Sequence, residues 1–209
     1  MSLIELTCAF PSGSADKIRL TEVSLRSAKT AYTGMVYDFK CNSMDGSYID
    51  LPGHIRETDN GQRSDNIDPG QFYRIPCSVI RLERTSGSGA VSGAELEQAF
   101  GGRVNTPALM INALGTLEPC DIEQRSVWLD FSALDWMISC GIRLLVSDIF
   151  ESQTLDGVFL KLFQAGISTV CEPRGMSRIR SKQVELTVLF PKFPSLTQIP
   201  CRVLADDGN

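Results

Sequence analysis

The residues best suited to chemistry stand close together in the segment SMDGSYIDLPGH, from Ser43 to His54. His54 is the only histidine of the chain, and it follows Asp50 by four residues. Because Pro52 and Gly53 lie between them, we predict an extended segment that ends in a turn rather than a helix. A carboxylate and an imidazole at this spacing could bind a metal or move a proton.

Two further residues of the segment bear on this possibility. On an extended strand Tyr48 and Asp50 point to the same face. Gly46 leaves room for the close approach of a ligand or of another backbone segment. Taken alone, an Asp and a His in a loop are more often a surface hydrogen bond than a functional site, so both interpretations stay open at this point.

The segment resembles the signature of the cyclase family that includes the kynurenine formamidases, which reads His-x-Gly-Thr-His-x-Asp-x-Pro-x-His. The matching residues are Gly46, Asp50, Pro52 and His54, with Ser47 as a near match. Met44 and Tyr48 replace the first two histidines. A second motif of the family, a His followed twelve residues later by a Glu at the end of a strand, is similar to LKLFQAGISTVCE, where Leu160 stands in the His position and Glu172 in the Glu position.

The resemblance implies an α/β fold, a swivelling β/β/α sandwich with a mixed sheet, and assembly into homodimers or homotetramers. It also implies a reaction, in which one or two divalent metals generate a hydroxide that attacks an amide or formamide carbonyl. In that scheme Asp50 and Glu172 are metal-binding carboxylates and His54 transfers the proton. These three residues are therefore the predicted catalytic set.

The replaced positions offer poor metal ligands. The thioether of Met44 is soft and neutral, which suits Zn or Mn poorly beside carboxylates. Tyr48 would have to ionise from a pKa of about 10, at a cost of about 4 kcal/mol at pH 7 unless the metal offsets it. Leu160 has no donor atom. We therefore expect no tightly bound cofactor, and at most a weak divalent site for Zn, Mn or Mg at Asp50 and Glu172.

Two functional hypotheses follow. The first is a hydrolase of the arylformamidase kind, with metal-dependent cleavage of an amide or formamide C–N bond weakened or lost. The second is a non-catalytic relative that keeps the fold to bind a small molecule or to assemble. Cys41 and Cys171 adjoin the motifs, but we predict both as buried structural thiols, with Cys171 pointing away from the side of Glu172.

Alternating and apolar runs predict the framework that positions these residues. The predicted strands are residues 3–10, 34–41, 77–83, 108–114, 142–148, 167–172, 184–190 and 201–205. A helix should begin at Ser92, which has capping-box spacing to Glu95. Two more helices are expected in 130–141 and 154–166. Together these elements predict an α/β protein with a mixed sheet, in which parallel and antiparallel pairings stay open.

The apolar stripes of the last two helices can also be read from the sequence. Phe131, Leu134 and Ile138 have helical spacing in the first, and Leu155, Val158, Phe159 and Leu162 do so in the second. Residues 55–70 have almost no apolar side chains, so we expect a surface loop near His54 that could serve as a lid.

Length and charge limit the class of protein. The 209 residues are enough for a single domain over 1–209, or for a domain with an appended arm. A formal charge of −5 opposes binding to a phosphate backbone, so nucleic acid is not expected as a partner. No apolar run is long enough to span a membrane, and the first residues do not resemble a secretion signal.

Seven scattered cysteines, without a Cys-x-x-Cys pair, indicate reduced and mostly buried thiols. We therefore expect a cytoplasmic protein that binds a small-molecule ligand or substrate.

Overall fold

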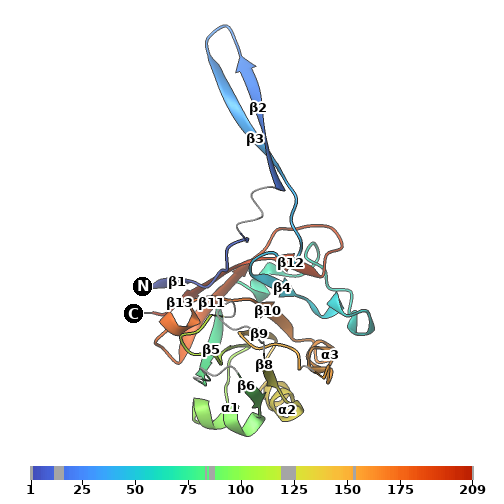
Figure 1. Ribbon diagram of the computed structural model, residues 1–209, viewed down its shortest axis with the longest axis vertical. Coiled ribbons are helices and arrows are strands. Elements are labelled where there is room, and N and C mark those ends of the chain that lie inside the picture. Colours follow the sequence, from blue (N-terminus) through green and yellow to red (C-terminus); the bar gives the residue numbers. More distant parts are fainter. Residues whose placement is uncertain are drawn as a thin grey trace.

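The computed structural model describes residues 2–11, 17–82, 84, 88–118, 126–152 and 154–208. Its centre is a nine-stranded, curled sheet with the order β1-β13-β11-β5-β7-β9-β10-β4-β12 (Figure 1). These strands are β1 (Leu3–Glu5), β4 (Tyr48–Asp50), β5 (Ile75–Arg81), β7 (Ala108–Asn112), β9 (Leu144–Ser147), β10 (Ser168–Cys171), β11 (Gln183–Leu189), β12 (Gln198–Pro200) and β13 (Arg202–Asp206). Two separate two-stranded sheets pair β2 (Ile18–Arg26) with β3 (Ala31–Phe39) and β6 (Ser88–Val91) with β8 (Ser126–Leu129).

The central sheet is mixed. Four adjacent strands are parallel to one another: β5, β7, β9 and β10. The pairs on either side of this series, from β1 to β5 and from β10 to β12, are antiparallel. The prediction of an α/β protein with a mixed sheet is confirmed, and the open question of strand direction is answered.

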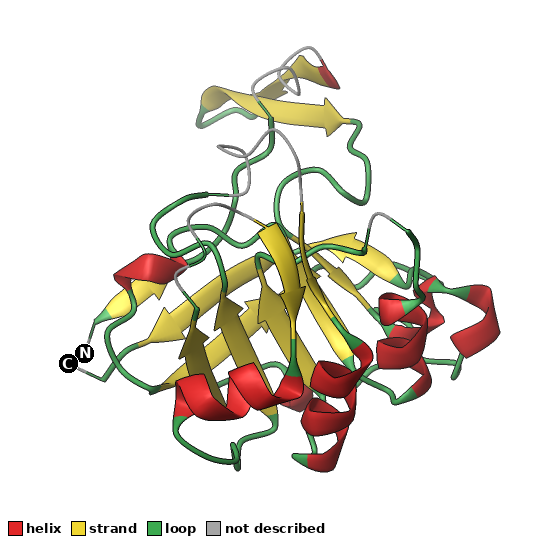
Figure 2. Cartoon of the chain, turned by 60° about the horizontal axis from the view of Figure 1, so that its bottom comes forward, coloured by secondary structure: helices red, strands yellow, loops and turns green. Residues whose placement is uncertain are grey.

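Three α-helices in the described chain lie against one side of the sheet (Figure 2): α1 (Gly93–Phe100), α2 (Phe131–Ser139) and α3 (Val158–Gln164). Buried side chains form two clusters because successive residues of a central strand face opposite sides. On β7, Leu109 belongs to the cluster under the helices, while Met110 belongs to the cluster on the other face. The sheet therefore separates two apolar cores.

One of the two hydrogen bonds expected of the predicted capping box of α1 is present. Ser92 Oγ accepts a hydrogen bond from the backbone N–H of Glu95 at 3.2 Å, as expected of an N-cap residue. The Glu95 carboxylate pairs instead with the Arg84 guanidinium. Asp130 caps α2 in the same way, accepting from the backbone N–H of Ala133 at 2.9 Å.

The predicted apolar stripes are partly wrong. In α2, Phe131 and Ile138 are exposed, and the buried face is made by Ala133, Leu134 and Met137. The helix is turned toward α1, where Gly93 packs against the backbone of Ser132 so closely that a Cβ would lie 2.5 Å from the Ser132 carbonyl.

A similar correction applies before α3. Leu155 is exposed and has a positive φ of 54°, so it lies outside the helix that was predicted to include it. The predicted end of that helix is confirmed, since Gly166 adopts the left-handed conformation (φ 74°).

Several strands were not predicted, namely β2, β6, β8 and β12. The segment 55–70 does run over the surface, but it is well structured. It contains a short 3-10 turn at Arg56–Thr58, and a second turn, Pro69–Gln71, begins at its end. Ser64 ties it to the β11–β12 connection, donating from Oγ to the Phe193 carbonyl at 2.6 Å. A lid function for this segment stays a prediction.

The described cysteines are free thiols, and Cys77 and Cys201 are buried as expected. Cys41 is exposed, so its prediction as a buried thiol was wrong; it lies at the base of the β2–β3 hairpin, where the chain has little to pack against. Cys120 and residues 85–87 of the predicted flexible loop lie outside the described residues. Within the described residues, no helix has the length and apolar character needed to cross a membrane.

Candidate functional site

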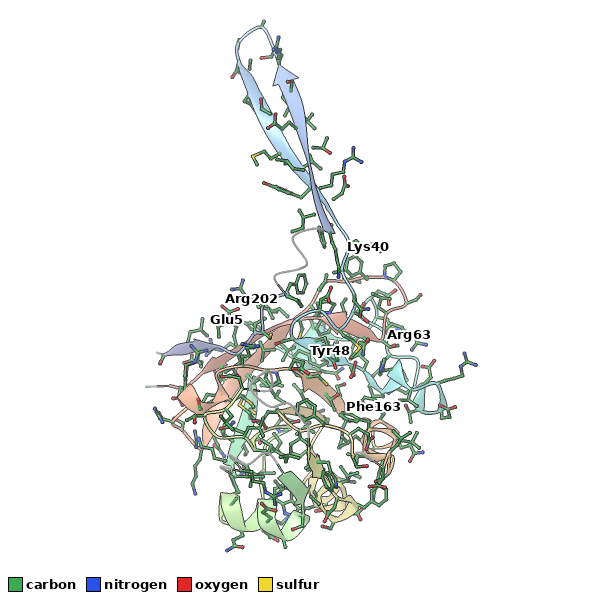
Figure 3. The ribbon with its side chains drawn as sticks, in the orientation of Figure 1. Glu5, Lys40, Tyr48, Arg63, Phe163 and Arg202 are labelled. Atoms are coloured by element: carbon green, nitrogen blue, oxygen red, sulfur yellow. The ribbon has the colours of Figure 1, made fainter. Side chains whose placement is uncertain are left out.

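The candidate site is built around the short strand β4, which lies between β10 and β12. Asp50 stands opposite Thr169 on one side and Gln198 on the other. Tyr48 stands opposite Cys171. Because directly opposed residues of antiparallel strands point to the same face, these five side chains share one face of the sheet. Tyr48 lies on the side of the sheet toward α3, whose Phe163 is also labelled in Figure 3.

Gly46 explains how the chain reaches this strand. It has a positive φ of 73°, and a Cβ there would lie 2.6 Å from the carbonyl oxygen of Cys8. The close approach predicted for this glycine is therefore that of another backbone segment. Ser47 continues the contact, since its Oγ accepts from the Cys8 N–H at 2.7 Å and donates to the Glu172 carbonyl at 2.7 Å.

Asp50 is a buried carboxyl group, only 5% exposed. Its Oδ2 accepts a weak hydrogen bond from Cys171 Sγ at 3.7 Å. Its Oδ1 is buried and has no hydrogen-bond partner among the residues that the structure describes. Burial raises the pKa of Asp50, while the nearby His54 and hydrogen bonds from Gln198 and Cys171 oppose that rise. The Asp50 carboxyl group is thus shielded from water, and its Oδ1 accepts no hydrogen bond from the described residues.

His54 lies at the end of the 3-10 turn Pro52–His54 that follows β4. Its Nε2 is 3.2 Å from Gln198 Nε2, and Gln198 Oε1 accepts from Ser43 Oγ at 2.5 Å. In this arrangement the Gln198 amide donates to the imidazole, which then carries its proton on Nδ1. The ring of Phe163 stands edge-on to the imidazole, with centroids 6.4 Å apart. The imidazole of the lone histidine is therefore held by the side-chain amide of Gln198.

Glu172 follows β10 in an unusual backbone conformation, with a φ of 54°. A non-glycine residue in the left-handed region leaves the alternation of the strand before it. The side chain is partly buried, and its charge is one of the groups that raise the pKa of Tyr48. The structure thus brings Glu172 near Tyr48. Tyr48 belongs to the group of side chains on one face of β4, β10 and β12, called the Asp50 cluster below, which consists of Tyr48, Asp50, Thr169, Cys171 and Gln198.

The three replaced positions differ in their surroundings. Met44 is 55% exposed in the turn before β4. Tyr48 is 8% exposed, and burial, followed by the neighbouring Cys171 and Asp50, raises the pKa of its phenol well above the usual value. Leu160 is partly buried on α3, one turn before Phe163 and on the same helix face.

Cys171 needs a correction. It was predicted as a buried structural thiol without a part in the site, but it is only partly buried and lies beside Asp50. The register that places it opposite Tyr48 is a long-range feature that the local sequence does not contain. Burial, together with the charge of Asp50, raises the pKa of its thiol, so it stays protonated as a thiol. Sequence reasoning also missed Thr169 and Gln198, for the same reason of register.

No family model matches the chain, and no curated protein matches it either. Solved structures do match it over nearly its full length. An isatin hydrolase A from Labrenzia aggregata, bound to benzyl benzoate, is 15% identical with a TM-score of 0.71, covering 98% of this chain and 93% of the other. A predicted metal-dependent hydrolase from Bacillus stearothermophilus is 15% identical with a TM-score of 0.66, covering 99% and 98%. A structure described as a novel cyclase is 10% identical with a TM-score of 0.65, covering 98% and 88%.

The chain has the cyclase fold. This agrees with the resemblance seen at Gly46, Asp50, Pro52 and His54. At these identities the likeness concerns the fold, so the chemistry must be judged from the side chains themselves.

The donor set of this cyclase-fold chain does not fit a tightly held divalent metal. Among the described residues, no three His, Cys, Asp or Glu side chains stand close enough together to hold an ion. Asp50 provides one free oxygen, while Tyr48 and Cys171 beside it are held protonated by burial. A zinc site needs three or four deprotonated or neutral nitrogen, sulfur or oxygen donors in tetrahedral arrangement.

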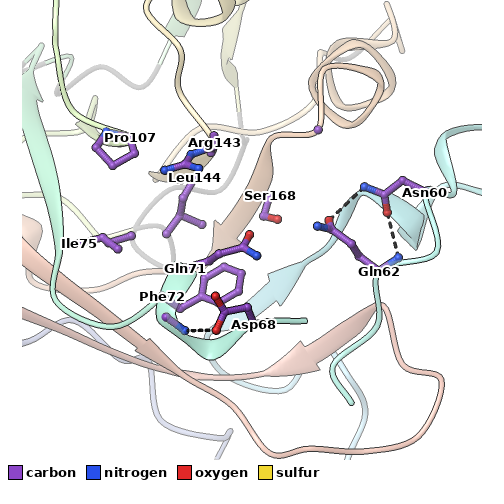
Figure 4. A pocket seen from close by; sticks show the side chains of 12 residues that line it. Asn60, Gln62, Asp68, Gln71, Phe72, Ile75, Pro107, Arg143, Leu144 and Ser168 are labelled. Carbon is purple, nitrogen blue, oxygen red and sulfur yellow. Dashed lines mark hydrogen bonds between the residues drawn. The ribbon is translucent and has the colours of Figure 1, made fainter. Parts of the chain in front are cut away.

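A separate pocket of about 430 Å³ lies on the opposite face of β10 (Figure 4). Ser168 lines it, and Ser168 and Thr169 point to opposite faces because they are neighbours on a strand. Arg143 also lines it, Asp68 comes from the surface segment 55–70, and Gln71 directly follows that segment. This pocket and the Asp50 cluster are therefore different places in the fold.

The pKa of Asp50 gives a first testable prediction. Burial raises it above its ordinary value of 3.8, so the folded chain binds this proton more tightly than the unfolded chain does. Asp50 therefore costs stability as pH rises from about 3.8 through its folded pKa, and that cost stays at higher pH. Asp50→Asn should leave stability almost unchanged near about pH 4 and raise the free energy of unfolding near about pH 8, as followed by urea denaturation. An equal effect at both pH values would show that Asp50 ionises as freely in the fold as in the unfolded chain.

Proposed function

We propose that this chain is a cyclase-fold relative of metal-dependent amide and formamide hydrolases in which metal-dependent cleavage of the C–N bond is weakened or lost. The Asp50 cluster is the observation on which this proposal depends. The Asp50 carboxyl group is buried, and its Oδ1 has no hydrogen-bond partner among the described residues. Its neighbours are protonated or amide groups rather than metal-binding imidazoles. In the family reaction Asp50 and Glu172 would hold the metal and His54 would transfer a proton.

The remaining groups support weak rather than efficient hydrolysis. An ion held by Asp50 and Glu172 alone would exchange readily, so we propose at most a loosely bound Zn, Mn or Mg. His54 retains the ability to accept a proton, but Gln198 occupies its Nε2. A substrate would have to displace this amide before the imidazole could act as a base.

The second candidate function is non-catalytic binding of a small molecule. It is favoured by the two hydrogen bonds that run from Ser43 through Gln198 to His54, which leave the Nε2 of the imidazole engaged by an amide. Isatin hydrolase structures of the same fold have been obtained with small molecules such as thioisatinate, described as a product analogue, and benzyl benzoate. By analogy we propose that a small carbonyl-containing aromatic molecule is the ligand or substrate here.

Several wider features belong to this proposal. We propose that residues 1–209 form one domain of the swivelling β/β/α sandwich type, that the protein works in the cytoplasm, and that it assembles as a homodimer or homotetramer. Neither nucleic acid nor a membrane is proposed as a partner.

The function is tested by turnover of N-formyl aromatic amides at saturating Zn, Mn or Mg, compared between the unmodified chain and His54→Ala. We expect turnover at least about 100-fold below a typical enzyme rate constant of about 10 per second. Any residual activity should fall further in His54→Ala, while Ser27→Ala, at the hairpin turn far from the site, serves as the matched control. Rapid turnover at ordinary enzyme rates would contradict the proposal of weakened chemistry.

A further inference from the structure

The pocket of about 430 Å³ lies where the four parallel strands of the central sheet begin (Figure 4). Ile75, Leu144 and Ser168 are the first residues of β5, β9 and β10, and Pro107 directly precedes β7. Most of the other lining residues come from the segment 60–72. Small-molecule sites have volumes of roughly 300–1,000 Å³, so a small ligand fits into this pocket.

Contacts with the rest of the chain hold the segment that supplies these residues. The Ser64 N–H donates to the Leu196 carbonyl at 2.9 Å. Phe72 is 4% exposed, and its ring stands edge-on to that of Phe190, with centroids 5.3 Å apart. The Phe72 carbonyl accepts from the Val188 N–H at 2.8 Å. The pocket is therefore preformed, which lowers the entropic cost of binding a ligand.

Ser168 places a hydroxyl group in the pocket. The residue is only 5% exposed, yet its Oγ makes no hydrogen bond with any residue that the structure describes. In Figure 4 this hydroxyl points into the space between Gln71 and Gln62. Buried hydroxyl groups almost always have a hydrogen-bond partner, because an unsatisfied one costs free energy. A ligand in the pocket can be that partner.

Amide side chains lie on the same side of the pocket as this hydroxyl (Figure 4). Asn60 Nδ2 donates to Gln62 Oε1 at 3.0 Å, and the Gln62 N–H donates to Asn60 Oδ1 at 3.1 Å. Within the described part of the chain, Gln62 Nε2 and the Gln71 amide have no partner. This side of the pocket therefore offers uncharged donors and acceptors to a ligand.

Two charged side chains of opposite sign also line the pocket, Arg143 and Asp68. In Figure 4 they stand on opposite sides, with Leu144 and Phe72 between them. The Arg143 guanidinium forms no ion pair or hydrogen bond with the described residues. Asp68 Oδ1 accepts from the Gly70 N–H at 3.0 Å, which leaves Oδ2 to a ligand. One cation and one anion in separate places favour a ligand that itself carries both signs.

The surface between the two charges is apolar. It is formed by Phe72, Ile75, Pro107 and Leu144, of which Phe72 and Leu144 are 4% and 2% exposed. An apolar ligand group that covers this surface is removed from water together with it. An aromatic ring packs favourably on Phe72, and it loses less conformational freedom on binding than a flexible chain does. The lining therefore favours an aromatic ligand.

We propose that this pocket binds a small aromatic zwitterion, whose carboxylate pairs with Arg143 and whose ammonium group pairs with Asp68. A guanidinium and a carboxylate form two parallel, charge-assisted hydrogen bonds, which fix the orientation of the ligand. The site uses no residue of the Asp50 cluster and lies on the other face of β10. It therefore goes beyond the proposed function and does not depend on it.

The experiment is isothermal titration of the full chain with para-aminomethylbenzoate, which carries a carboxylate and an ammonium group at opposite ends of one ring. Benzoate and benzylamine each carry one of these charges and are the comparison ligands. We expect one molecule of para-aminomethylbenzoate to bind per chain, with a dissociation constant below about 1 mM. Its affinity should exceed that of either comparison ligand by at least about 10-fold.

Two variants test which side chain meets each end of the ligand. In Arg143→Gln, para-aminomethylbenzoate should bind at least about 10-fold more weakly, and no better than benzylamine binds to the unmodified chain. In Asp68→Asn it should bind no better than benzoate does, although the Asn side chain can still accept from the Gly70 N–H. Arg19→Gln removes an exposed arginine of β2 and is the matched control, which should leave the affinity unchanged.

His54→Ala distinguishes this pocket from the candidate site and should also leave the affinity for para-aminomethylbenzoate unchanged. The proposal is overturned if this ligand binds no better than benzoate or benzylamine, or if neither Arg143→Gln nor Asp68→Asn weakens its binding. It is overturned as well if His54→Ala weakens binding as much as these two variants do. The titration does not depend on turnover, so its failure would leave the proposed chemistry unaffected.

Discussion

The triple variant Met44→His, Tyr48→His, Leu160→His is expected to bind one zinc ion at least about 100-fold more tightly than the unmodified chain. Three imidazoles would join Asp50, which already has a buried oxygen without a partner among the described residues. Position 48 shares a strand face with Asp50, and position 160 lies on the face of α3 that approaches His54 through Phe163. Together these groups supply the nitrogen and oxygen donors that zinc prefers.

The affinity is measured by isothermal titration, with circular dichroism to verify that the variant is folded. The matched control is Met44→Leu, Tyr48→Phe, Leu160→Ile, which changes the same positions without adding a donor. An equally weak zinc affinity in the folded histidine variant and in its control would show that the cluster cannot be arranged around a metal, so the loss of donors would not be the reason for weak binding.

Asp148→Ala is expected to destabilise the fold by about 3–5 kcal/mol, because it leaves several buried donors without acceptors. Asp148 follows β9 and is only 2% exposed. Its carboxylate accepts from the backbone N–H groups of Ala113 and Leu114 at 2.7 and 3.1 Å, and from Asn112 Nδ2 at 3.0 Å. It thereby joins the ends of the parallel strands β7 and β9.

The free energy of unfolding is obtained from urea denaturation at neutral pH. Ser147→Ala, at the neighbouring buried position, is the control for general disturbance of the strand and should cost less than about 1 kcal/mol. A loss of less than about 1 kcal/mol in Asp148→Ala would mean that water satisfies the three donors, and that Asp148 does not anchor these strands.

Local sequence signals predicted much of the framework. Short β-branched and apolar runs identified β5 and β11, and the side-chain caps Ser92 and Asp130 fixed the beginnings of α1 and α2. These features depend on residues that are near one another in the chain. The exposed face of α2 was misjudged because its orientation depends on the contact with Gly93 of another helix. Helical spacing alone cannot tell which side a neighbour will cover.

The candidate site was predictable in its residues but not in its contacts. Asp50 and His54 were identified from their types and spacing, yet the group that engages His54 is Gln198, which lies near the other end of the chain. Cys171 was assigned no part in the site, although register places it beside Asp50. These contacts depend on the pairing of β4 with β10 and β12, which short-range patterns do not specify.

The hairpin was missed in part for a different reason. Alternation predicts a strand over 34–41, which overlaps the observed strand Ala31–Phe39, but the sequence predicts no strand at its partner, Ile18–Arg26. Apolar residues in β2 are interspersed with charged and hydroxyl side chains, as is expected of a strand that is not buried in its own domain. The possibility of an appended arm followed from chain length, while the place of this arm in the chain needed the structure.

The central claim is that the side chains of this cyclase-fold chain do not bind a divalent metal tightly. Metal content is the most direct measurement of it. The protein should be purified without chelator, and its Zn, Mn and Mg should be quantified by elemental analysis alongside melting temperatures at rising concentrations of each ion. We expect well below one equivalent of any metal and no rise in melting temperature at micromolar ion, since a ligand stabilises the fold only near or above its dissociation constant. One full equivalent of a transition metal that survives dialysis, with a melting temperature that falls on its removal, would contradict the account.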